Sequence, residues 1–164
     1  MIESVLVKLF EHNHWANMQI LQTCATLSDE LFDAEPDATT KGSIRATLQH
    51  LFESQQSYWT QVAGIQPLFN WQTPPDFAEL QRAATITGEG LLALAKDESN
   101  KLNLTFHYDG YSIEPWVVMV QAINHATEHR EQIKSMLSTL GITPPRIDGW
   151  MYGNVTQALV QIAA

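Results

Sequence analysis

The strongest chemical signal in the sequence is a pair of histidines, His125 and His129, separated by three residues. In an α-helix such residues lie on one face, about 6 Å apart along the axis and about 40° apart around it. Two imidazoles at this spacing can reach one metal ion. The apolar residues on the same face are Val118, Ala122, Met136 and Leu140. A buried imidazole needs either a hydrogen-bond partner or a metal ion, and the spacing alone leaves both open.

A third histidine, His50, lies at the edge of the apolar face of another predicted helix, residues 43–62. Helical bundles commonly build a metal site from one side chain on one helix and a spaced pair on another. His50 is therefore the candidate third ligand beside His125 and His129. Cys24 is the only cysteine, so a cysteine-based zinc site is excluded.

Two protease patterns overlap the histidine pair, and we disfavour both. The H-E-x-x-H pattern needs a glutamate at position 126, which is Ala126. The inverted H-x-x-E-H pattern is matched by His125, Glu128 and His129. It lacks a suitable acidic third ligand, because Glu131 is too close and the next acidic residue follows the Gly-Pro segment that ends the helix.

Two asparagines and two glutamates are further candidates for the site. Asn13 and Asn17 share the apolar face of the first predicted helix, where their amides would either line a substrate pocket or bridge neighbouring helices. Glu128 and Glu131 would either orient a ligating histidine from behind or occupy a solvated helix face. The sequence leaves both alternatives open.

The elements that position these residues are predicted from periodicity and from the residues that begin and end helices. The predicted long helices span residues 2–26, 43–62, 76–96 and 116–140. Gly88 and Gly90 weaken the third prediction, since each costs about 1 kcal/mol relative to alanine. Asp109-Gly110 between alternating runs predicts a β-hairpin over residues 102–114, and a short helical segment over residues 148–162 is expected to pack back. We therefore predict an all-α fold, a four-helix bundle with a short β-hairpin inserted before the fourth helix.

Length and charge limit the class of protein. The 164 residues fit a single domain, residues 1–164. The formal charge of −9 and the absence of any Lys/Arg run disfavour nucleic acid and anionic membranes as partners. The sequence has no uncharged apolar stretch of about 18 residues and no signal-peptide pattern, so we expect a soluble cytoplasmic protein.

Four stretches together resemble the DinB/YfiT-like superfamily of small bacterial helical bundles. Their order and spacing carry the resemblance across nearly the whole chain. The stretches are Asn13-His14-Trp15-Ala16-Asn17, the segment from Ser43 to Trp59 with His50, the segment from Asn124 to Ile133 with both spaced histidines, and Asp148-Gly149-Trp150-Met151-Tyr152.

The resemblance implies a four-helix bundle, often a homodimer, that binds a divalent metal ion through His50, His125 and His129. Characterised relatives are thiol transferases or isomerases that use a low-molecular-weight thiol. Our leading hypothesis is a zinc- or nickel-dependent enzyme. It would be either a thiol-dependent transferase that acts on a small electrophile or a hydrolase. The alternatives are a non-catalytic, metal-stabilised and stress-related dimeric module, and a metal-free polar core.

Overall fold

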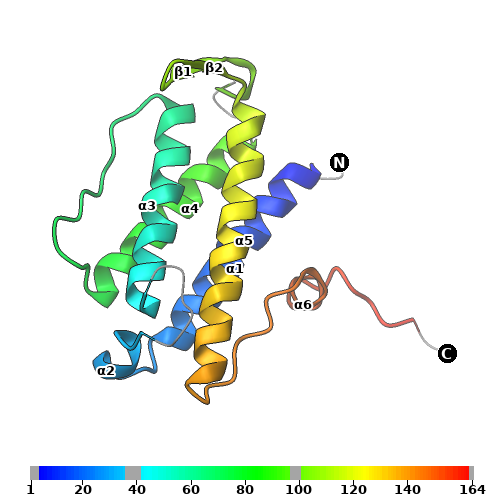
Figure 1. Cartoon of the computed structure of the whole chain (residues 1–164). Coiled ribbons are helices and arrows are strands. Elements are labelled where there is room, and N and C mark those ends of the chain that lie inside the picture. Colours follow the sequence, from blue (N-terminus) through cyan, green and yellow to red (C-terminus); the bar gives the residue numbers. More distant parts are fainter. Residues whose placement is uncertain (1–3, 36–41, 97–100, 163–164) are drawn as a thin grey trace.

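The computed structural model describes residues 4–35, 42–96 and 101–162, which are mostly helical and include one two-stranded sheet (Figure 1). The helices are α1 (Val5–Cys24), α2 (Asp29–Phe32), α3 (Ile44–Ala63), α4 (Phe77–Lys96), the 3-10 turn η1 (Lys101–Asn103), α5 (Pro115–Thr139) and α6 (Gly149–Val155). The antiparallel strands are β1 (Phe106–Tyr108) and β2 (Tyr111–Ile113). The predicted helical fold with a hairpin before the last long helix is confirmed. No helix in the described ranges is long and apolar enough to span a membrane.

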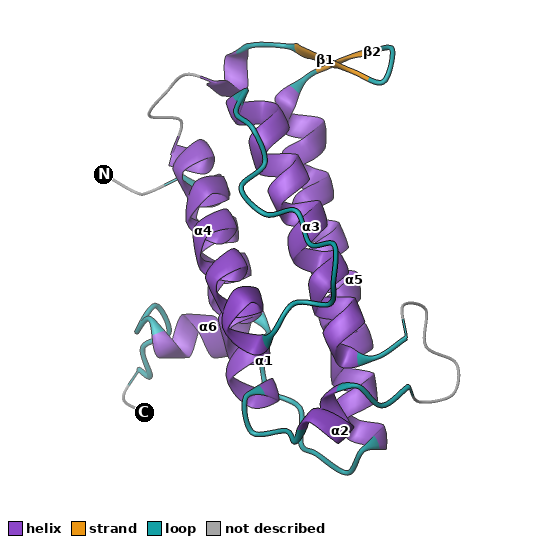
Figure 2. Cartoon of the chain, turned by 90° about the vertical axis from the view of Figure 1, so that its left-hand side faces the viewer, coloured by secondary structure: helices purple, strands orange, loops and turns teal. Residues whose placement is uncertain are grey.

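Each of the long helices α1, α3, α4 and α5 packs against two of the others. Figure 2 shows α1 and α4 on one side and α3 and α5 on the other. Helix α1 packs on α4 and α5, and α3 packs on the same two helices from the other side. Two apolar clusters fill the interior, one toward α2 and one toward the hairpin. The largest fully buried side chains are Phe10, Phe52, Ile20, Leu21, Ile44, Leu48, Leu51, Leu80, Leu91, Met119, Ile133 and Leu137.

Local signals in the sequence set the ends of these elements. Ser43 is the predicted N-cap of α3, and its hydroxyl accepts a hydrogen bond from the Ala46 amide at 3.2 Å. Gly64 ends the same helix with a φ of 69°. In the hairpin turn, Asp109 and Gly110 have φ angles of 47° and 80°, as a two-residue type I′ turn requires.

Helix α4 forms although it contains Gly88 and Gly90. A β-carbon at Gly88 would overlap the His14 imidazole of α1, and one at Gly90 would overlap the Trp59 ring of α3. The two glycines therefore allow close packing on both neighbouring helices, which compensates for their low helix propensity.

The structure differs from the sequence prediction near the C-terminus. Helix α6 ends at Val155, and Gln157 has a φ of 58°, which is incompatible with a continuing helix. The prediction of a helical segment reaching residue 162 is therefore wrong, and Val160 is 80% exposed. Helix α6 still contacts α1, because the Tyr152 ring packs edge-on against the His12 ring at a centroid distance of 5.4 Å. The sequence analysis did not predict α2.

A buried arginine, Arg130, joins α5 to α1. The residue is 3% exposed. Nη1 donates hydrogen bonds to the Oδ1 atoms of Asn13 and Asn17 at 2.6 and 2.7 Å. Nη2 donates to the Thr127 hydroxyl at 3.0 Å. These acceptors are all neutral.

The hydrogen bonds continue from Asn17 into the other two long helices. Asn17 Nδ2 donates to Gln55 Oε1 on α3 at 2.9 Å, and Gln55 Nε2 donates to the Thr87 hydroxyl on α4 at 2.7 Å. The Thr87 hydroxyl donates to the Ala83 carbonyl at 2.7 Å. We call Thr127, Arg130, Asn13, Asn17, Gln55 and Thr87 the Arg130 network. It connects all four long helices of the described chain.

We predict that Arg130→Met destabilises the protein strongly. Two buried amide oxygens, those of Asn13 and Asn17, lose their donor, and each loss costs about 1–3 kcal/mol. Urea denaturation should therefore show an unfolding free energy lower by about 2–6 kcal/mol. Arg146→Met changes an exposed arginine and serves as control, with an expected effect within about 0.5 kcal/mol.

A double-mutant cycle tests the contact itself. Asn13→Ala should cost less in the Arg130→Met background than in the wild type, by about 1 kcal/mol, because the two residues share one interaction. Strictly additive effects would contradict this coupling.

Candidate metal centre

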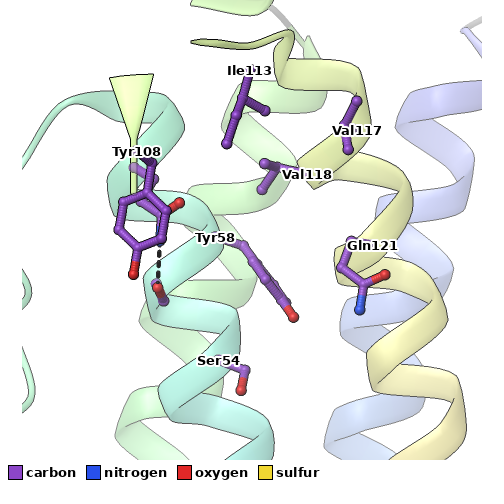
Figure 3. A pocket seen from close by; sticks show the side chains of 9 residues that line it. Ser54, Tyr58, Tyr108, Ile113, Val117, Val118 and Gln121 are labelled. Atoms are coloured by element: carbon purple, nitrogen blue, oxygen red, sulfur yellow. Dashed lines mark hydrogen bonds between the residues drawn. The ribbon is translucent and has the colours of Figure 1, made fainter. Parts of the chain in front are cut away.

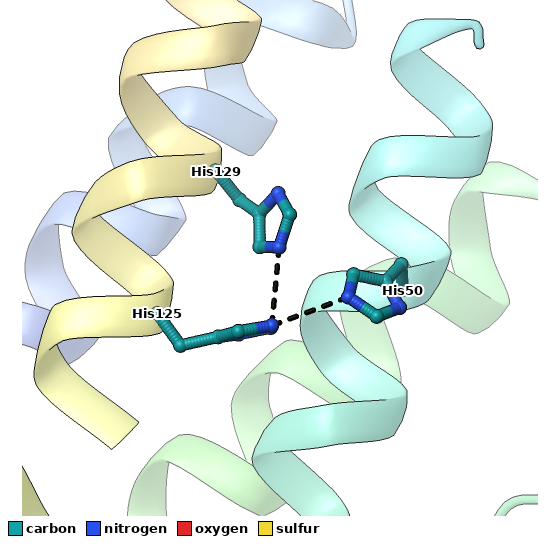
Figure 4. A group of neighbouring side chains, drawn as sticks. All are labelled: His50, His125 and His129. Carbon is teal, nitrogen blue, oxygen red and sulfur yellow. Dashed lines mark hydrogen bonds between the residues drawn. The ribbon is translucent and has the colours of Figure 1, made fainter. Parts of the chain in front are cut away.

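Three histidine side chains from two helices meet at one point (Figure 4). His50 comes from α3, and His125 and His129 come from successive turns of α5. The Nε2 atom of His125 lies 3.2 Å from Nε2 of His50 and 3.1 Å from Nε2 of His129. The three potential ligand atoms lie within 4.8 Å of one another. The structure thus brings together the three histidines selected from the sequence.

This spacing fits a divalent metal ion. Imidazole nitrogens at about 2.0–2.1 Å from a tetrahedral zinc ion lie about 3.3 Å from each other. The two short nitrogen–nitrogen distances, 3.1 and 3.2 Å, are close to that value. Three imidazoles occupy three positions of a tetrahedron, and the fourth position remains for another ligand.

Gln132 holds the His129 ring in place through a hydrogen bond. The Nδ1–H group of His129 donates a hydrogen bond to Gln132 Oε1 at 2.7 Å. A neutral imidazole carries one hydrogen, so Nε2 keeps a lone pair directed at the other two histidines. Such a partner behind a ligating histidine fixes its tautomer and ring orientation. The sequence analysis missed Gln132, although its position three residues after His129 was the available signal.

The structure places the two predicted glutamate partners on the surface of α5. Glu131 accepts hydrogen bonds from the Lys134 ammonium at 2.8 and 3.1 Å. The Glu128 side chain is exposed. Their proposed role in orienting a histidine stays a prediction.

Asn13 and Asn17 lie in the protein interior, each 1% exposed. Both accept hydrogen bonds from Arg130, and Asn17 also donates to Gln55. The structure therefore places both amides in the helix-bridging position that the sequence left as one of two alternatives.

A pocket of about 400 Å³ lies between α3, α5 and the hairpin, one helical turn from His50 and His125 (Figure 3). Ser54 lies one helical turn beyond His50 on α3, and Gln121 lies one turn before His125 on α5. The Tyr58 ring contacts the His125 ring edge-on at a centroid distance of 5.8 Å. The lining residues are Ser54, Ser57, Tyr58, Gln61, Tyr108, Ile113, Val117, Val118 and Gln121.

Cys24 is not part of the centre. Its side chain is 2% exposed, and burial raises the pKa of its thiol to about 12. The thiol therefore stays protonated at neutral pH. A cysteine that binds a metal or acts as a nucleophile must instead be a thiolate.

We predict that Gln132→Leu weakens metal binding about 10–100-fold, because His129 loses the acceptor that fixes its tautomer. Gln132→Glu keeps an acceptor at this position and should retain most of the affinity. Competition with a fluorescent zinc chelator measures both.

Glu128→Gln is the matched control on the same helix, and we expect its affinity to equal that of the wild type. An unchanged affinity in Gln132→Leu would show that the hydrogen bond does not orient the ligand.

Comparison with known proteins identifies the family of the chain. No curated protein sequence matches the chain. The sequence model of the DinB family matches residues 1–160 of the 164 residues, which include His50, His125 and His129. The chain belongs to the DinB family.

Proposed function

We propose that this protein is a divalent-metal-dependent enzyme built on a four-helix bundle. The activity that we propose first is that of a thiol-dependent transferase. The second is that of a hydrolase that uses the same metal chemistry. The observation that carries the proposal is the convergence of three histidine Nε2 atoms beside a pocket. Catalytic zinc sites have three protein ligands and one position for water or substrate, and the three histidines match that ligand number.

In this proposal three residues would bind the ion, and a fourth residue orients one of these three. His50, His125 and His129 would hold the ion, and Gln132 keeps His129 in the tautomer that binds it. A divalent ion held by three imidazoles supplies Lewis acidity and lowers the pKa of a coordinated water or thiol. The pocket walls next to His50 and His125 would position the second reactant.

Zinc and nickel are the ions that we propose, because imidazole suits both. A low-molecular-weight thiol and a small electrophile are the proposed substrates of the transferase. The alternative, a non-catalytic and stress-related dimeric module, needs a protein group as fourth ligand. The adjoining pocket favours the enzyme.

We also propose a homodimer. Two large apolar side chains on the N-terminal half of α5, Trp116 and Val120, are exposed, and contiguous apolar surface often marks an interface. Light scattering should give about twice the monomer mass of 18.5 kDa. A mass equal to the monomer across the micromolar range would contradict the dimer.

We predict that each of the substitutions His50→Ala, His125→Ala and His129→Ala lowers the metal content of purified protein, because all three ligands bind one ion. Elemental analysis after reconstitution with zinc or nickel measures the content. His107→Ala, in the exposed part of β1, should keep full occupancy. Equal metal content in His50→Ala and wild type would contradict the shared site.

Stability and activity give two further readouts of the same variants. An ion that binds only the folded state raises the free energy of unfolding by about 4 kcal/mol when its free concentration is a thousand times Kd. A chelator should therefore lower the melting temperature of the wild type and barely affect His125→Ala. Conjugation of low-molecular-weight thiols to 1-chloro-2,4-dinitrobenzene should need metal and all three histidines. Metal binding without such activity for any thiol tested would favour the non-catalytic module.

A further inference from the structure

We propose that the pocket between α3, α5 and the hairpin binds the uncharged, planar part of a substrate whose polar end faces the three histidines. We call it the Tyr58 pocket, after the residue that contacts both it and His125. The proposal rests on the metal-dependent function proposed above and specifies the class of ligand.

The position of the pocket follows from the two helices that carry the histidines. Ser54 and Gln121 lie one turn from His50 and His125 respectively, and both displacements point toward the hairpin end. One turn is about 5.4 Å along a helix. A small ligand that reaches the histidines with one end would therefore place its other end between Ser54 and Gln121.

The lining of the pocket selects an uncharged group. None of its nine lining residues carries a formal charge, and Ile113, Val117 and Val118 form an apolar wall (Figure 3). A charged substituent would find no countercharge among these residues. The hydroxyls of Ser54 and Tyr58 and the amide of Gln121 supply the few polar groups that fix orientation in small-molecule sites.

Two tyrosines from separate elements favour a planar ligand. Tyr58 extends from α3 toward the space in front of Gln121, and Tyr108 approaches α3 from strand β1 (Figure 3). Aromatic rings bind other rings in edge-to-face or offset geometry and bury a large area. The volume, about 400 Å³, lies within the usual range for small-molecule sites of about 300–1,000 Å³.

Two hydroxamates with the same metal-binding group test this proposal on the zinc-loaded protein. Acetohydroxamate carries a methyl group, and benzohydroxamate carries a phenyl ring that would enter the Tyr58 pocket. Isothermal titration calorimetry should show at least tenfold tighter binding of benzohydroxamate. A third probe, 4-carboxybenzohydroxamate, should bind at least tenfold more weakly than benzohydroxamate because its charge would enter the uncharged pocket.

Two variants fill the pocket from opposite walls, Gln121→Trp from α5 and Ser54→Phe from α3. At least one should remove the preference for benzohydroxamate while acetohydroxamate still binds. Ser135→Trp is the matched control, since it adds the same bulk at an exposed position about 21 Å further along α5. It should bind both probes as the wild type does.

The outcomes separate this proposal from the proposed function. If zinc is bound and neither hydroxamate binds, the ion offers no free position, and the enzyme and the pocket ligand both fail. If acetohydroxamate binds and benzohydroxamate gains nothing, or neither filling variant removes the gain, the pocket proposal alone is overturned. Equal binding of the carboxylated probe would overturn the requirement for an uncharged group.

Discussion

The buried guanidinium of Arg130 is the constraint on which the arrangement of the four long helices depends. Burial lowers the pKa of Arg130 to about 10, so the group is still charged at neutral pH in an interior that disfavours charge. Within the described residues, its side-chain hydrogen bonds go to neutral oxygens, those of Thr127, Asn13 and Asn17. Helices α5 and α1 must deliver these acceptors together, because a buried donor without an acceptor costs more than the bond returns. The same requirement applies to α3 and α4, because Asn17 donates to Gln55 on α3 and Gln55 donates to Thr87 on α4.

This network also sets the rotation of α5, and with it the metal centre. Arg130 follows His129 directly, so the two side chains leave the helix about 100° apart. While Arg130 points at α1, His129 is turned toward α3, where His50 lies. The Asn17–Gln55 bond fixes α3 against α1 at the position five residues beyond His50. The network lies between the two apolar clusters and joins both histidine-bearing helices to α1, which supports precise placement of the three histidines.

The sequence was informative where the chemistry is local. The spacing of His125 and His129, the serine cap of α3 and the Asp109-Gly110 turn each act within a few residues, and the structure contains all three features. It was ambiguous where partners are distant in the chain. Asn13 lies 117 residues from Arg130, so periodicity could place its amide on a buried face without identifying the donor. For the same reason the Tyr58 pocket, which needs residues of α3, the hairpin and α5, was not anticipated. The residues after Val155 have helical periodicity but little to pack on, and tertiary contacts decide short helices.

The metal centre and the Tyr58 pocket depend on parts of the fold that differ in rigidity. All three histidines project from long helices locked by the Arg130 network, so their geometry is insensitive to changes at the molecular surface. The outer wall of the pocket comes from a hairpin of two three-residue strands, a unit that is only marginally stable alone and relies on packing against α3. Tyr108 and Ile113 can therefore change in size or polarity with little effect on the histidines. In the proposed function the helices would determine which ion is held, and the hairpin would determine which ligand reaches it.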